Sequence, residues 1–408
     1  MKCRHCQTQL QHVFLDLGHA PPSNAYLSEA QLHAPETTLP LKIFVCHACW
    51  LVQTEDYTVA HELFSSDYAY FSSTSQGWMK HAKAYCEKIS EMLHLTRDSF
   101  VIEIASNDGY LLKNFVEMGV PCLGIEPTAS TAGAAERIGV PVLRDFFGAA
   151  TATMLAANGQ RADLVCGNNV YAHVPDINDF TLGLRIVLKP GGTVNLEFPH
   201  LKNMVEQNQF DTAYHEHFSY LSLTAVSQIF ERAGLRIFDL EELPTHGGSL
   251  RIYGCDKDDS RQTTAAVKTL LADEKRLGLQ DLSLYRAFQQ KADKVKNDFL
   301  AFLIEQKRAG KLVAAYGAAA KGNTLMNYAG LKPDLMSFVC DAAASKQNKF
   351  MPGSHIPIRH PAELAKRKPD WVVILPWNIS SEVMQQHKQI KTWGGNFVIA
   401  VPKLKVLT

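Results

Sequence analysis

The segment 210–220, FDTAYHEHFSY, places two histidines, a glutamate and two tyrosines within seven positions. Side chains of these types can transfer protons, and two histidines could also bind a metal ion. A metal site is disfavoured because the H-E-x-x-H spacing is absent and no third ligand lies nearby in sequence. In an extended strand Tyr214 and Glu216 would face away from His215 and His217, whereas a tight turn could bring all four together. Acid–base chemistry is the favoured hypothesis, with structural packing and metal binding as alternatives.

A second reactive group is formed by four cysteines in two Cys-x-x-Cys pairs: Cys3, Cys6, Cys46 and Cys49. Four thiolates at this spacing fit a closed tetrahedral zinc site. The gap between the pairs is longer than in common zinc fingers, so a redox-active or merely buried pair is the alternative. Histidines beside each pair could replace a cysteine but are not needed. A zinc ion held by four cysteines has no open position, so its predicted role is structural.

A short buried strand at 100–104 ends in a turn that leads into a helix, ASNDGYLL. The motif is not the glycine-rich cradle of dinucleotide-binding proteins. Asp108 would repel phosphates, which favours a ligand with cationic and hydroxyl-bearing parts, such as S-adenosylmethionine. The candidate ligands of this cofactor in the motif are Glu103, Ser106, Asn107 and Gly109.

Three later strand ends add candidate cofactor residues. The carboxylate in GIEP, about 20 residues on, could bridge two ribose hydroxyls. RDFF offers a carboxylate and a ring for an adenine, and GNNVYAHV follows the next strand at the carboxyl edge, where ligands bind in such sheets. These residues are Glu126, Pro127, Asp145, Phe146, Asn168 and Asn169. Their order predicts a methyltransferase sheet, and a dinucleotide-dependent dehydrogenase is the alternative.

The elements that would position these residues alternate between strands and helices, which predicts an α/β fold with a doubly wound parallel sheet. We expect a zinc-binding domain at 1–60 and a cofactor-binding domain at 61–260. The third part, 261–408, would combine a helical connector of one or two long helices at 262–310 with a smaller α/β domain. Two strand-like runs in LRIFDLEELPTHGGSLRIYGCDK would lie at the edge of the central sheet.

Bulk properties describe an ordinary globular protein of 408 residues, 46% hydrophobic and 20% charged. Lysine plus arginine and aspartate plus glutamate both number 41, which argues against a nucleic-acid or membrane-surface partner. We find no signal peptide and no apolar run of about 18 residues. The isolated cysteines suit a reducing cytoplasm. A small-molecule substrate is expected, and the oligomeric state is open, with a monomer plausible.

Ordered motifs along the whole chain resemble those of one known family. They are the four cysteines, YAYFSSTS, EIASNDGYLL, GIEP, GNNVYAHV, YHEHFSYLSL, THGGSLR, GAAAKGNTLMNYAG and KFMPGSHIPI. The chain resembles the three-domain sugar C-3-methyltransferases of deoxysugar biosynthesis, such as the C-methyltransferase of the tetronitrose pathway. The resemblance implies structural Zn²⁺, S-adenosylmethionine bound by a central Rossmann-like domain, and a C-terminal Rossmann-like domain that helps to hold a sugar nucleotide.

The resemblance also implies methyl transfer to C3 of a nucleotide-linked 4-keto-6-deoxy sugar. The family's Y-H-E-H stretch falls on residues 214–217, so His217 is implied as the base, with Tyr214 and Glu216 assisting. His173 lies where the family has an active-site histidine. A base near C3 and donors near the C4 oxygen are what enolate formation requires. O- or N-methylation of a sugar or small molecule is the alternative, and a zinc-containing nucleic-acid-binding or scaffold protein is the rival from another class.

Further residues are candidates for contact with the sugar nucleotide. Tyr68 and Tyr70 could stack on the ligand or merely cover the cleft, and THGGSLR could be a sugar contact or a hairpin turn. In YGAAAKGNTL, small residues, a lysine and a helix start suit a diphosphate. These substrate candidates are Tyr68, Tyr70, His246, Arg251, Lys321, Asn323 and Lys349. GAAAKGNTL departs from the family in having alanines where many relatives have a proline.

Overall fold

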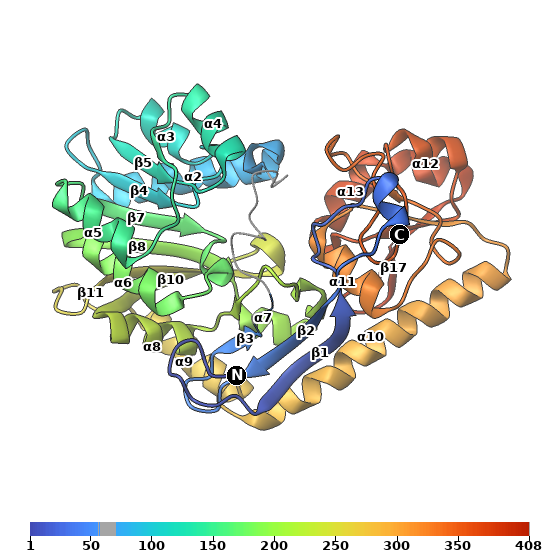
Figure 1. Cartoon of the computed structure of the whole chain (residues 1–408), viewed down its shortest axis with the longest axis horizontal. Coiled ribbons are helices and arrows are strands. Elements are labelled where there is room, and N and C mark those ends of the chain that lie inside the picture. Colours follow the sequence, from blue (N-terminus) through green and yellow to red (C-terminus); the bar gives the residue numbers. More distant parts are fainter. Residues whose placement is uncertain (56, 58–70, 408) are drawn as a thin grey trace.

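The structure, a computed structural model, describes residues 1–55, 57 and 71–407. Three sheets and their helices form the molecule. Figure 1 shows two α/β parts facing each other above a small N-terminal sheet and a long helix. The predicted α/β class with a cysteine-bearing N-terminal part is confirmed. None of the helices in the described ranges combines the length and hydropathy of a membrane span.

The N-terminal sheet is antiparallel and includes a strand from far along the chain. Its strands lie in the order β1 (His12–Ala20), β2 (Leu39–Val45), β3 (Val52–Thr54) and β9 (Ser219–Tyr220). A short 3-10 helix, η1 (Ala30–His33), lies between β1 and β2. Because β9 begins two residues after His217, this sheet holds the end of the segment that carries the paired histidines.

The central sheet has seven strands, and all but one point the same way. Their order is β10 (Leu235–Leu243), β11 (Ser249–Asp256), β8 (Leu188–Pro199), β7 (Ala162–Asn168), β4 (Val101–Ile104), β5 (Cys122–Ile125) and β6 (Val142–Leu143). Strand β11 is antiparallel to both neighbours, whereas β4 to β8 pair in parallel. All four residues of β4 are buried, as expected for a central parallel strand. The two edge strands predicted at 235–257 are β10 and β11.

The helices of the central part carry ordinary end signals. They are α2 (Gln76–Leu93), α3 (Leu112–Glu117), α4 (Ala129–Arg137), α5 (Ala149–Ala157), α6 (Ile177–Val187), α7 (Leu201–Glu206) and α8 (Leu223–Ala233). The Ser222 side chain caps α8 by accepting from the backbone of Ala225, and Gly234 ends it with φ 77°. Short 3-10 helices η2 (Ser72–Thr74), η3 (Tyr171–His173), η4 (Phe210–Thr212) and η5 (Thr245–Gly247) lie near strand ends.

Two helices form the predicted connector, α9 (Ala265–Leu277) and α10 (Leu282–Arg308). The buried residues of α10 recur every three or four positions, so one face packs against the core. Its Phe288 stacks on Phe14 of β1, with ring centroids 4.6 Å apart. One apolar core therefore joins the N-terminal sheet, α10 and the C-terminal part, and Figure 1 shows α10 running along the base of the molecule.

The C-terminal sheet has six strands in the order β14 (Ile358–Arg359), β13 (Val339–Cys340), β12 (Val313–Tyr316), β15 (Trp371–Ile374), β16 (Asn396–Ile399) and β17 (Lys405–Leu407). All pairs are parallel except that of β16 and β17. Its helices are α11 (Ala320–Tyr328), α12 (Ala362–Arg367), α13 (Ser380–Gln386) and the 3-10 helices η6 (Trp377–Ile379) and η7 (Lys388–Trp393). The second α/β pattern predicted from 311 onward is confirmed, and the short strands β14 and β17 are additions to it.

Candidate active site and zinc site

A cavity of about 840 Å³ lies at the carboxyl edge of the central sheet. Its walls come from the loops after β4, β5, β6 and β7, from the turn before β9, and from the start of α11. Thirteen of the residues predicted from the sequence line it: Asn107, Glu126, Pro127, Asp145, Phe146, Asn168, Asn169, His173, Tyr214, Glu216, His217, His246 and Lys321. The structure therefore brings seven of the ten candidate cofactor residues and the candidate proton-transfer residues into one cavity.

The loop after β4 is shaped by backbone conformations that favour small or polar residues. Asn107 and Gly109 have φ of 50° and 77°. A Cβ on Gly109 would lie 3.1 Å from Ala135, so the glycine lets helix α4 pack closely against the loop. Gly109 thus belongs to the support of the cavity wall, and Asn107 to its surface.

The carboxylate of Glu126 joins this loop to the loop after β5. One of its carboxylate oxygens accepts from the backbone N–H of Asn107 at 3.0 Å, and the other accepts from that of Thr128 at 2.9 Å. These bonds fix the carboxylate at the cavity wall, and each oxygen keeps a further lone pair. The geometry can accept two hydroxyl donors, as a ribose diol requires.

Glu103 and Ser106 lie beneath the loop and do not line the cavity. Both are fully buried, and the carboxylate of Glu103 has no hydrogen-bond partner among the described residues. Burial raises its pKa well above the ordinary range, and the nearby Asp108 and Glu126 raise it further. Glu103 is therefore held as a neutral acid behind the cavity wall.

The far wall carries amides and an aromatic ring. Both amide atoms of Asn168 are buried without a partner in the described part of the chain, so they can serve a ligand. Asn169 donates to Nε2 of His246 at 2.9 Å. Asp145 accepts from the backbone N–H of Phe146 at 2.8 Å, and both residues face the cavity. Together with Glu126, this set fits the hydroxyls, amine and ring of S-adenosylmethionine.

The Tyr-His-Glu-His stretch forms a turn rather than a strand, with the N–H of His217 donating to the carbonyl of Tyr214 at 3.0 Å. Tyr214, Glu216 and His217 line the cavity. His215 points the other way, and its Nε2 lies 3.2 Å from the carbonyl of Pro40. In an extended strand, Glu216 and His217 would face opposite sides. In the turn, both side chains face the cavity.

Hydrogen bonds fix the tautomers of two histidines. Nδ1 of His217 lies 3.0 Å from the carbonyl of Thr212, and Nδ1 of His173 lies 2.7 Å from that of Glu216. A carbonyl only accepts, so both Nδ1 atoms carry the proton and each Nε2 has its lone pair when the ring is neutral. The two ring centroids are 4.7 Å apart, and the ring of Tyr214 is 4.0 Å from that of His217.

Burial controls the charges of these groups. It lowers the pKa of His173 to about 4 and that of His246 to about 4. Burial also holds the pKa of His217 well below its ordinary range, and the neighbouring Lys321, together with the protonatable rings of His173 and His246, lowers it further. The three imidazoles are therefore neutral at neutral pH, and burial raises the pKa of Glu216.

Two lysines reach the cavity from the C-terminal part. Nζ of Lys321, in the first turn of α11, lies 3.0 Å from the side-chain oxygen of Asn378 and 4.8 Å from the ring of Trp377. Nζ of Lys346 donates to the carbonyl of Ala318 at 2.8 Å. Burial lowers the pKa of both lysines, so an anion that entered the cavity would relieve the cost of their charges.

The other five substrate candidates either do not line the cavity or lie outside the described residues. Arg251 is buried and donates to Glu197 at 2.6 Å. Asn323 is buried and donates to the carbonyl of Ser23, and Lys349 is absent from the cavity lining. Tyr68 and Tyr70 lie outside the described residues.

Sequence reasoning missed several lining residues, and Asn24 and Lys346 are two polar ones among them. Asn24 follows β1 of the N-terminal part, and Lys346 lies in the loop after β13. No local motif marks either residue. Both reach the cavity only because the N-terminal and C-terminal parts pack against the central sheet.

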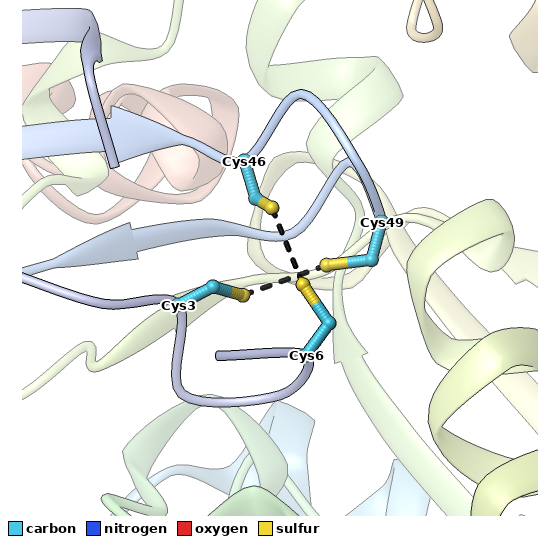
Figure 2. A group of neighbouring side chains, drawn as sticks. All are labelled: Cys3, Cys6, Cys46 and Cys49. Carbon is cyan, nitrogen blue, oxygen red and sulfur yellow. Dashed lines mark hydrogen bonds between the residues drawn. The ribbon is translucent and has the colours of Figure 1, made fainter. Parts of the chain in front are cut away.

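The four predicted cysteines converge, as Figure 2 shows. Their sulfur atoms all lie within 4.8 Å of one another, with Cys3 and Cys49 at 3.5 Å and Cys6 and Cys46 at 3.5 Å. A tetrahedral zinc ion with Zn–S bonds of about 2.3 Å would separate its sulfurs by about 3.8 Å. The cluster therefore fits a closed zinc site, and it provides no open position for chemistry.

Comparisons with known proteins identify a zinc-binding part and a methyltransferase part of the chain. Family models match a zinc binding domain at residues 3–64, a methyltransferase domain at 77–240 and a C-methyltransferase C-terminal domain at 244–402. The C-methyltransferase NovU of Streptomyces niveus is 31% identical over 407 residues, which cover 100% of this chain and 97% of that protein.

Among solved structures, the glycopeptide N-methyltransferase MtfA aligns with 43% of this chain and 96% of its own, at 12% identity and a TM-score of 0.35. An S-adenosylmethionine-dependent methyltransferase from Clostridium acetobutylicum aligns with 43% of this chain and 91% of its own, at 10% identity and a TM-score of 0.35. Because these TM-scores are low, the assignment depends on the sequence comparisons. The chain belongs to the three-domain, zinc-binding C-methyltransferases that use S-adenosylmethionine as methyl donor.

Proposed function

We propose that this enzyme transfers a methyl group to C3 of a nucleotide-linked 4-keto-6-deoxy sugar. The observation that carries the proposal is the position of His217, a neutral imidazole with a fixed tautomer in the cavity that also contains the cofactor loop. Methylation at carbon requires a base to create the nucleophile, whereas a hydroxyl or amine already has a lone pair.

The C3 proton becomes acidic when the neighbouring carbonyl oxygen is polarised. Nε2 of His217 accepts this proton, and the hydroxyl of Tyr214 donates to the oxygen that becomes negative. S-adenosylmethionine, when bound, supplies an electrophilic methyl group. The chain contributes a buried site in which these groups are already oriented. Few water molecules can then compete for their hydrogen bonds.

Lys321 and Lys346 bind the diphosphate of the sugar nucleotide in this proposal, with the N-terminus of α11 adding free N–H groups. Lys346 thus takes the part that the sequence suggested for Lys349. An anion beside Lys321 would offset one of the positive charges that hold the pKa of His217 low. Substrate binding should therefore strengthen the base.

Glu126 is assigned to the ribose hydroxyls, and Asp145, Phe146 and Asn168 to the adenosyl part. The fixed carboxylate of Glu126 and the unpartnered amide of Asn168 support these assignments. Glu216 assists as a hydrogen-bond acceptor for the sugar.

Turnover with a panel of 4-keto-deoxysugar nucleotides, followed by mass spectrometry, tests the proposal. In D₂O without cofactor, we expect solvent deuterium to enter C3 of an accepted substrate. Methyl transfer to oxygen or nitrogen, without any exchange at C3, would replace the proposal with O- or N-methylation.

A further inference from the structure

The C-terminal part touches the proton-transfer turn as well as the cavity. In α11 the hydroxyl of Thr324 donates to the carbonyl of Ala213 at 2.6 Å, and both residues are buried. Ala213 directly precedes Tyr214, the first residue of the turn. The position of the turn is therefore fixed by a residue 111 positions away in the chain.

The neighbouring residue of α11 makes a parallel contact. The amide of Asn323 donates to the carbonyl of Ser23 at 2.6 Å. The next residue, Asn24, lines the cavity and donates to a carboxylate oxygen of Glu216 at 3.0 Å. Two consecutive helix residues thus hold two loops, and each loop leads within one residue to a group in the cavity.

The same helix carries Lys321, three residues before Thr324 and therefore on a neighbouring face. Asn323 and Thr324 are 0% and 3% exposed, so their bonds are shielded from water. A third contact supports the arrangement, because the hydroxyl of Tyr26 donates to the carbonyl of Ala318 at 2.6 Å, just before α11.

We propose that Asn323 and Thr324 are positioning residues: they fix the turn 214–217 and the Asn24–Glu216 bond relative to Lys321, and do not bind substrate. The expected effect on kcat rests on the proposed function. This positioning role replaces the substrate contact that the sequence suggests for Asn323. It also implies that the C-terminal domain takes part in proton removal by holding the base in place.

The test compares Thr324→Val, which keeps the shape and removes the donor, with Thr324→Ser, which restores it. Leaving the buried carbonyl of Ala213 unpaired should lower kcat about 10-fold to 100-fold. We expect the KM for the sugar nucleotide and the Kd for S-adenosylmethionine to stay within about 2-fold, and Thr324→Ser to recover most of kcat. Thr181→Val is the matched control, since it removes a buried hydroxyl in α6.

A second measurement needs no substrate. In protein with ¹³C-labelled histidine, the ring signal of His217, identified by its loss in His217→Asn, should shift in Thr324→Val and return in Thr324→Ser. Unchanged kcat and an unchanged His217 signal in Thr324→Val would overturn the inference, as would an equal loss of kcat in Thr181→Val. If the wild type methylates no sugar nucleotide, the proposed function fails, and the His217 signal still decides the positioning role.

Discussion

The turn 214–217 allows a sharp test, because its two histidines face opposite ways. His217→Asn keeps a side-chain donor for the carbonyl of Thr212 and removes the lone pair that accepts the C3 proton. His215→Asn is the matched control, since His215 contacts Pro40 outside the cavity. Both changes remove an imidazole from the same short turn. They differ in that only His217 lines the cavity.

General-base catalysis by a positioned side chain contributes about 10²-fold to 10⁴-fold. We therefore expect His217→Asn to lower kcat by that factor, equivalent to about 3–5 kcal/mol of transition-state stabilisation. Binding of S-adenosylmethionine, measured by calorimetry, should be unchanged, because the hydrogen bonds of His217 are made to Thr212 and Tyr214. His215→Asn should retain kcat within about 3-fold.

The assay is single-turnover methyl transfer followed by mass spectrometry, together with deuterium entry at C3. The pKa of His217 is lowered in the folded enzyme, so the base becomes protonated only in the acid range. The pH profile of kcat/KM should be flat near neutrality and fall only at a pH below the ordinary titration range of histidine. Retention of more than about one tenth of wild-type kcat by His217→Asn, or equal losses in both variants, would refute the assignment of the base.

Three further changes test other parts of the molecule. Cys46→Ser should lose near-stoichiometric zinc by metal analysis and lower the melting temperature, whereas Cys166→Ser, at a buried cysteine outside the cluster, should retain zinc. Glu103→Gln should stabilise the protein above about pH 4.5. The pKa of Glu103 is raised in the folded state, so the contribution of Glu103 to wild-type stability is fully present below that pH and is lost as pH rises, whereas glutamine does not titrate. The difference in unfolding free energy between the two proteins should therefore grow with pH, and a constant difference would contradict the buried neutral acid. Lys346→Ala should raise the KM for the sugar nucleotide about 10-fold with little change in kcat. Lys349→Ala, at a residue that does not line the cavity, should leave this KM unchanged. Similar KM values for the two variants would count against the diphosphate site.

The sequence predicted the parts of the site that are local in the chain. Glu126 directly follows β5 and Asn168 is the last residue of β7. Parallel strands end at the same edge of a sheet, so the order of motifs was enough to group these residues. The four cysteines were found by spacing for a similar reason, since each knuckle is a short turn. The side that His217 faces was not predictable, because strand and turn differ by only a few backbone angles.

Contacts between distant segments account for what the sequence did not reveal. Arg251 and Lys349 looked available because charged residues in loops are normally exposed, yet Arg251 pairs with Glu197 inside the fold. Asn24 and Lys346 gained their places only through packing of three separate parts. Such positions depend on long-range complementarity, which has no period or spacing along the chain.

The pairing of β3 with β9 links the zinc site to the turnover rate of the enzyme. The Cys46–Cys49 knuckle lies just before β3, and β9 follows the turn 214–217. Loss of zinc would loosen β3 and, through it, the strand β9 that holds this turn. An enzyme molecule without zinc should therefore be inactive, rather than active with a lower affinity for its substrates. A chelator would then reduce the maximal rate in proportion to the zinc removed, and neither substrate would protect by competition.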